Sequence, residues 1–189
     1  MKNKTLLCGI DEAGRGCLAG PMVVAGVILS EPIPGLDDSK KLTKQKRETL
    51  YETIIQKASH YHICIISPEE IDTRGISPTL TGALKEIMKT LPADEFLFDG
   101  NSSYGIAGLQ HLVKADSQVE SVAAASILAK VTKDRELLEA GKDFPHFDFT
   151  SHQGYGTQKH IDEIKRLGMT PIHRKSYKLK SLRQPTFDF

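Results

Sequence analysis

The sequence predicts an α/β fold in which a mixed β-sheet is flanked by helices. Two apolar, strand-like runs, residues 5–10 and 22–29, are joined only by a glycine-rich turn, which is typical of an antiparallel pair. Later strand-like segments alternate with segments of helical periodicity, which indicates parallel strands with helical connections. The chain has 189 residues, of which 39% are hydrophobic and 26% charged. Such a chain fits one globular domain over residues 1–189.

The elements of the first half follow from apolar spacing. The run at 22–29 is rich in valine, and the proline- and glycine-containing stretch 31–35 ends it as a turn. Residues 44–58 carry apolar side chains at helical spacing, among them Leu50 and Ile54. Residues 60–67 contain three isoleucines and predict a third strand.

The second half continues this alternation. Pro68 suits the first turn of a short helix, since proline is tolerated there. The sequence then predicts a helix at 77–91, strands at 95–98 and 110–115, and helices at 119–140 and 157–167. A basic tail at about 173–189 follows. Residues 146–156 lack clear periodicity and are a candidate functional loop.

Several classes of protein are excluded. The longest apolar run is far shorter than the ~18 residues that cross a bilayer, and no cleavable signal is evident, so we expect a cytoplasmic protein without membrane association. Three cysteines without C-x-x-C spacing read as reduced structural thiols, and the thiol and imidazole spacing of zinc sites is absent. The loop 14–20 is followed by a strand instead of a helix, which excludes a dinucleotide-binding motif, and no P-loop sequence occurs.

Charge is balanced overall but clustered locally. The net charge is +1, yet five basic residues lie within 40–47 and five more within 174–183. Each cluster alone is compatible with an ordinary solvated face. Together they are candidates for contacts with phosphates.

Acidic side chains form the main candidate site. Asp11 and Glu12 follow the first predicted strand, and Asp99 follows the fourth. Asp134 shares a helical arc with apolar residues, and a carboxylate facing a core needs a partner or a metal. If these four acids converge, they suit Mg²⁺ or Mn²⁺. The simpler alternatives are solvated acids at strand ends, a turn at Asp99, and an i,i+4 pair of Asp134 with Lys130.

Six motifs together resemble the bacterial ribonuclease HII (type 2 ribonuclease H) family. The resemblance covers residues 7–177, and the six motifs occur in the family's order. They are 9–16 (GIDEAGRG), 36–42 (LDDSKKL), 99–101 (DGN), 123–134 (AAASILAKVTKD), 152–157 (HQGYGT) and 173–177 (HRKSY). The sequence departs from the family's usual residues at Cys17 and Ala115.

The resemblance implies a ribonuclease H-like fold with a central mixed five-stranded sheet. It implies a metal-dependent endonuclease that hydrolyses RNA in RNA/DNA hybrids and cuts 5′ of ribonucleotides embedded in duplex DNA, as in ribonucleotide excision repair. The expected products carry 3′-hydroxyl and 5′-phosphate ends, and the expected cofactor is Mn²⁺ or Mg²⁺, as two ions with substrate bound. The family's catalytic and metal-binding acids map onto Asp11, Glu12, Asp99 and Asp134.

The resemblance also assigns substrate contacts. The loop Gly14, Arg15 and Gly16 would read the ribose 2′-hydroxyl, and the ring of Tyr155 would lie beside the scissile step. Phosphates would be held by Ser39, Lys40, Lys41, His173 and Arg174. For His173 a purely structural role is an equally open alternative.

Other functions remain possible at this point. One is a different metal-dependent nuclease on a related fold, which would not require a 2′-hydroxyl. Another is a hybrid-binding module without catalysis. The end of the chain, from Gln184 to Phe189, has a glutamine followed by spaced apolar residues and resembles peptides that bind sliding clamps; coverage of the domain's own surface is the simpler alternative. We expect a monomer.

Overall fold

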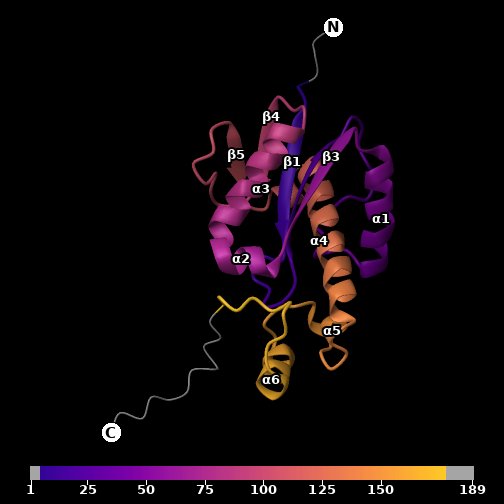
Figure 1. The fold of residues 1–189 in the computed structure, drawn as a ribbon. Coiled ribbons are helices and arrows are strands. Elements are labelled where there is room, and N and C mark those ends of the chain that lie inside the picture. Colours follow the sequence, from indigo (N-terminus) through magenta and orange to yellow (C-terminus); the bar gives the residue numbers. More distant parts are fainter. Residues whose placement is uncertain (1–4, 178–189) are drawn as a thin grey trace.

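A five-stranded sheet forms the centre of the computed structural model, which describes residues 5–177 (Figure 1). The strand order is β3-β2-β1-β4-β5. Strand β2 is antiparallel to β1 and β3, whereas β4 is parallel to β1 and β5 is parallel to β4. The strands are β1 Leu7–Ala13, β2 Met22–Ile28, β3 His60–Ile66, β4 Glu95–Asp99 and β5 Leu109–Leu112. The predicted mixed five-stranded α/β sheet is confirmed.

Three of the helices begin directly after a hydroxyl side chain that caps them. Thr43, Ser67 and Thr157 each accept a hydrogen bond from a backbone N–H in the first turn of α1, α2 and α6. The helices are α1 Lys44–Lys57, α2 Pro68–Arg74, α3 Ile76–Thr90, α4 Glu120–Gly141, α5 Phe149–His152 and α6 Gln158–Leu167, with a 3₁₀ helix η1 at Ala115–Ser117. Within residues 5–177, none of these helices combines the length and apolar character needed to cross a membrane.

Helices cover both faces of the sheet (Figure 1). Strand β1 alternates, so that Cys8 and Ile10 pack with Leu84 of α3 in one apolar core. The opposite face of β2 packs with α1 and α4 in a second core. A third, smaller cluster joins the end of α4 to α5 and α6.

Gly9 allows α4 to contact β1 directly. A Cβ atom at Gly9 would lie 2.3 Å from the carbonyl carbon of Ser121 and from the nitrogen of Val122, both in the first turn of α4. No larger residue fits there without moving the helix. Because side chains alternate along a strand, Asp11 faces the same helix as Gly9.

Three predicted boundaries differ from the structure. Strand β1 continues to Ala13, because its pairing with β2 persists to Ala13 and Val23, so Asp11 and Glu12 lie within the strand instead of after it. Strand β5 ends at Leu112, and Lys114 adopts a left-handed conformation with φ of 60° that starts η1. The stretch 146–156 is not entirely irregular, since it contains α5.

Candidate active site

Three aspartates from separate elements converge at one end of the central strands. Ile10 of β1 lies opposite Phe98 of β4, so the next residues, Asp11 and Asp99, are neighbours on parallel strands. Asp116 of η1 joins them. One carboxylate oxygen from each of these three aspartates lies within 4.8 Å of the other two.

The turn after β5 places Asp116. The backbone N–H of Lys114 donates to Oδ1 of Asp99 at 3.0 Å, and that of Asp116 donates to Oδ2 at 3.5 Å. The Asp99 carboxylate therefore anchors the backbone of η1, and the side chain of Asp116 is buried beside it. Asp99 and Asp116 are thus held beside each other by the hydrogen bonds between the Asp99 carboxylate and the backbone at Lys114 and Asp116.

Burial and mutual repulsion raise the pKa values of Asp11, Glu12 and Asp116 in the absence of a cation. Burial, followed by the charges of Glu12 and Asp99, raises the pKa of Asp11 well above its usual range. Burial also raises the pKa of Glu12 to about 7, and burial together with Asp99 raises the pKa of Asp116 to about 6. A bound dication would remove this penalty.

The donor set fits a hard divalent cation. Oε2 of Glu12 is buried and has no hydrogen-bond partner, so it is an oxygen available for coordination. The cluster offers carboxylate oxygens, which are the ligands that Mg²⁺ and Mn²⁺ prefer. Asp11, Glu12, Asp99 and Asp116 are therefore the residues suited to hold such an ion.

Asp134 does not lie in this cluster, which corrects the sequence-based convergence of four acids. Its carboxylate binds Nζ of Lys130 and Nζ of Lys133, each at 3.0 Å, and the Lys133 side chain is fully buried. Eight residues separate Asp134 from Ser126, which lines the acidic cavity, and that spacing corresponds to about 12 Å along α4. The alternative i,i+4 pair with Lys130 is confirmed, and the buried Lys133 explains why an acid occupies this arc.

The sequence did contain a signal for Asp116. It directly follows the predicted strand 110–115, as Asp99 directly follows the strand 95–98. The same rule of acids at strand ends that selected Asp99 would therefore have selected Asp116.

A cavity of about 210 Å³ adjoins the acids and brings most of the predicted substrate contacts together. Its lining includes Asp11, Glu12, Arg15, Ser39, Lys40 and Tyr155. Gly14 and Gly16 also line it, and Gly14 has a φ of 86°, which favours glycine. A larger cavity of about 460 Å³, beside Thr5 and Glu120, has no aspartate, histidine or basic residue among its lining residues.

The side chains predicted to contact the substrate differ in their exposure and in the partners that they already have. Oγ of Ser39 is buried against Oγ of Ser126 at 2.8 Å, whereas Lys40 is exposed. Lys41 pairs with Asp37 at 3.0 Å and is not among the residues that line the cavity. Tyr155 is 38% exposed, and the Nζ of the buried Lys133 lies 4.7 Å from its ring centroid.

His173 and Arg174 are buried, so neither side chain is accessible to a phosphate backbone, which corrects their assignment to substrate binding. Arg174 is 0% exposed and donates to the carbonyl oxygens of Gly20 and Arg15. These hydrogen bonds therefore hold the backbone of the glycine loop, residues 14–20. Nδ1 of His173 accepts from the backbone of Thr170, and its Nε2 faces Nε2 of His160 at 3.0 Å.

Comparisons with known proteins point to one family. A family model for ribonuclease HII matches residues 8–180. A ribonuclease HII of Sulfurovum sp. is 49% identical over 187 residues, which cover 98% of this chain and 99% of that protein. One from Aliarcobacter butzleri is 52% identical over 184 residues, covering 96% and 94%. The ribonuclease HII in a complex with PCNA from Archaeoglobus fulgidus is similar in structure, with a TM-score of 0.80, 32% identity, and coverage of 96% and 98%.

Substitutions at Asp116 and Asp134 should have opposite consequences. We expect Asp116→Asn to weaken Mn²⁺ binding by at least the ~10-fold that loss of even an outer-shell partner costs. Asp134→Asn should leave that affinity near the wild-type value but lower the free energy of unfolding by on the order of 2 kcal/mol, because it leaves Lys133 with a weaker partner. Isothermal titration and urea unfolding measure the two effects. Equal Mn²⁺ affinities of Asp116→Asn and wild type would contradict the proposed ligand set.

Acid should destabilise the protein through the buried histidines. Burial, followed by the charges of His160 and His152, lowers the pKa of His173 to about 4. The unfolded chain binds this proton near pH 6.5, so the stability held above that pH is lost as the pH falls from about 6.5 to about 4, by on the order of 3 kcal/mol. We expect His173→Gln to reduce this loss, and the exposed His146→Gln not to. Urea unfolding at pH 6.5 and pH 4 measures the free energy of unfolding of each protein. An equal loss in wild type and His173→Gln between these pH values would contradict the prediction.

Proposed function

Because the chain belongs to the ribonuclease HII family of metal-dependent ribonuclease H hydrolases, it is an endoribonuclease of RNA/DNA hybrids, and we propose that it also cuts 5′ of single ribonucleotides in duplex DNA. The proposed products carry a 3′-hydroxyl and a 5′-phosphate. One juxtaposition supports this proposal most directly. The buried Asp11 and the partly buried Glu12 lead without interruption into the glycine loop that lines the same cavity.

The acids would hold the metal. Asp11, Asp99 and Asp116 supply clustered carboxylates, and Glu12 adds its unpartnered oxygen. Bound Mg²⁺ or Mn²⁺, which we propose as two ions with substrate present, would supply an activated water and charge neutralisation at the scissile phosphate. The chain's own contribution is to hold these carboxylates in place through the backbone of η1 and the pairing of β1 with β4.

The glycine loop would recognise the 2′-hydroxyl. Close approach of a sugar requires backbone without side chains, and Gly14 and Gly16 flank Arg15 in this loop. A Cβ at Gly14 would lie 2.6 Å from the carbonyl oxygen of Pro21, so the turn is tightly enclosed. The buried Arg174 donates to the carbonyl oxygen of Arg15 at 3.1 Å, which anchors the backbone of the loop.

Tyr155 and the exposed cations would position the duplex. The half-exposed ring of Tyr155 provides an apolar face for the neighbouring deoxynucleotide. Lys40 and Arg15 line the cavity and would neutralise phosphates, while Lys41 would contact a phosphate outside it. Ser39 supports the site through its hydrogen bond with Ser126. Such contacts hold the backbone without reading base sequence.

Matched duplexes test this function directly. We expect the wild-type protein with Mn²⁺ to cut duplexes that carry one or four ribonucleotides and to leave the all-DNA duplex intact, since a site that binds a hydroxyl rejects the analogue that lacks it. Tyr155→Ala should slow single-turnover cleavage at a lone ribonucleotide by about 10-fold, because stacking contributes ~1–3 kcal/mol per base. Product ends are identified by ligation and gel mobility.

Controls separate this function from its rivals. Tyr61→Ala, which removes an exposed ring from β3, should leave the rate unchanged. Equal cutting of the all-DNA duplex would indicate a nuclease that does not sense the 2′-hydroxyl. Hybrid binding by the wild type without metal-dependent turnover would indicate a binding module. For Asp116→Asn, in contrast, we expect hybrid binding to be kept and the cleavage rate to fall at least ~100-fold.

A sliding clamp is a proposed partner. The segment from Gln184 to Phe189 lies outside the described residues, and its support is the spacing of its glutamine and apolar residues. The related Archaeoglobus fulgidus protein was solved in a complex with PCNA. Deleting residues 184–189 should abolish retention by an immobilised clamp while cleavage is kept. Unchanged retention of the truncated protein would rule out this segment. A monomeric state, a cytoplasmic location and a single domain over residues 1–189 also stay proposals.

A further inference from the structure

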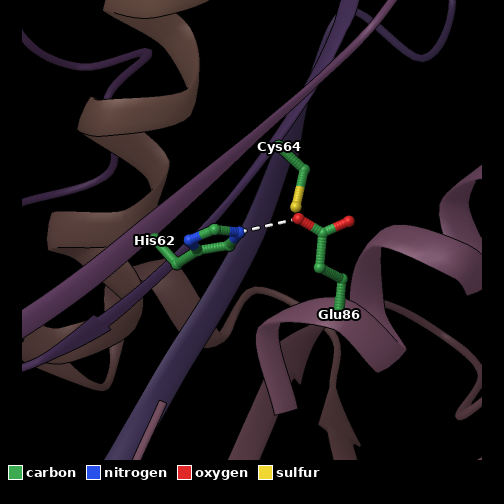
Figure 2. A group of neighbouring side chains, drawn as sticks. All are labelled: His62, Cys64 and Glu86. Atoms are coloured by element: carbon green, nitrogen blue, oxygen red, sulfur yellow. Dashed lines mark hydrogen bonds and ion pairs between the residues drawn. The ribbon is translucent and has the colours of Figure 1, made fainter. Parts of the chain in front are cut away.

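Three side chains of different chemistry meet on the outer part of the sheet, away from the acidic cluster. His62 and Cys64 belong to β3, and Glu86 belongs to α3 (Figure 2). Nε2 of His62 lies 2.9 Å from Oε1 of Glu86. One nitrogen, one sulfur and one carboxylate oxygen from the three residues all lie within 4.8 Å of one another.

The backbone around this group is held by the fold. His62 and Cys64 are two residues apart, so both side chains leave the same face of β3. Strand β3 is paired with β2, with Cys64 opposite Val24. Glu86 precedes the fully buried Ile87, which packs α3 onto the same core as Cys64. The three donor atoms are therefore brought together before any ligand binds.

We propose that His62, Cys64 and Glu86 form a second metal site, which binds a borderline-soft divalent ion of the Zn²⁺ class. Sulfur and imidazole donors select Zn²⁺ over Mg²⁺, in contrast to the all-oxygen acidic cluster. A thiolate and a carboxylate together neutralise the two positive charges of the ion. Three protein ligands leave a fourth tetrahedral position for water.

Binding requires one proton to leave. Burial, followed by the charge of Glu86, raises the pKa of the Cys64 thiol to about 12, so the sulfur is protonated without a metal. When the ion binds, the sulfur–metal bond replaces the S–H bond, and the proton passes to solvent. In the metal-free protein the ring proton of His62 lies on Nε2, which donates to the Glu86 carboxylate. On metal binding Nε2 gives up this proton to solvent and Nδ1 takes one from solvent, so that the Nε2 lone pair coordinates the ion and the ring stays neutral. The hydrogen bond between His62 and Glu86 is exchanged for two metal–ligand bonds.

Space for the fourth ligand lies beside the group. A cavity of about 300 Å³ is lined by Cys64 and Glu86, and also by Glu70 and Arg74 of α2. Glu70 and Arg74 pair with each other at 2.6 Å. A water on the metal would face this polar cavity. The site would then link the edge strand β3 to α3.

Cobalt provides a specific probe, because a cobalt–thiolate bond has its own charge-transfer absorption band. The full chain carries Asp99→Asn, so that binding at the acidic cluster is weakened, and is titrated with Co²⁺ under reducing conditions. We expect a thiolate–cobalt band that saturates at one ion per chain and is displaced by Zn²⁺. The band should vanish in Cys64→Ser and His62→Gln, and Glu86→Gln should weaken Co²⁺ binding by at least ~10-fold.

Matched controls keep the proposal falsifiable. His60→Gln removes an exposed imidazole from the same face of β3 and should keep the band. Cleavage of hybrid with Mg²⁺, measured without Asp99→Asn, should be unchanged in the site variants. No band with Co²⁺, or an equal band in Cys64→Ser, would overturn the site. If Cys64→Ser does not fold, an undiminished band in both His62→Gln and Glu86→Gln would overturn it equally.

Discussion

The contact between α4 and Gly9 is the constraint on which the candidate active site depends. Because Gly9 has no side chain, the first turn of α4 lies directly against β1. The next residue on that face, Asp11, is thereby buried beneath the helix near Ser126. Ser126 in turn forms a hydrogen bond with Ser39, which directly precedes the basic residues of 40–47. The absence of a side chain at Gly9 thus sets how closely α4 approaches β1, and through Ser126 it also positions the loop that carries Lys40.

The structure contains two separate charge systems with different partners. The acidic cluster is rich in carboxylates whose pKa values are raised by burial, so it is stabilised by a cation. Beside Tyr155, the buried Lys133 is neutralised within the protein by Asp134. The first system is the proposed metal site, whereas in the second Lys133 and Asp134 neutralise each other. An acid on a helix and acids at the ends of strands therefore have different partners in this fold.

Support for the glycine loop comes from a distant part of the chain. Arg174 is fully buried and donates to the carbonyl oxygens of Arg15 and Gly20. Tyr177 adds a hydrogen bond from its hydroxyl to the same Arg15 carbonyl at 2.6 Å. In the proposed function this loop approaches a sugar closely, so it can carry few side chains of its own. The hydrogen bonds that hold its backbone come instead from Arg174 and Tyr177.

Local pattern alone determined the strand and helix order, the family and the acids at strand ends, since strand periodicity places Asp11 and Asp99 at one end of the sheet. Only the tertiary structure decided which other residues join them. Helical periodicity indicates which face of α4 bears Asp134 but not how far along the sheet it lies, so only the structure separates Asp134 from the cluster that Asp116 joins. Likewise, the charge of Arg174 suggested a phosphate contact, but the side chain is buried and donates to carbonyl oxygens of the glycine loop instead. Distances between elements depend on packing, and packing is a property of the whole chain.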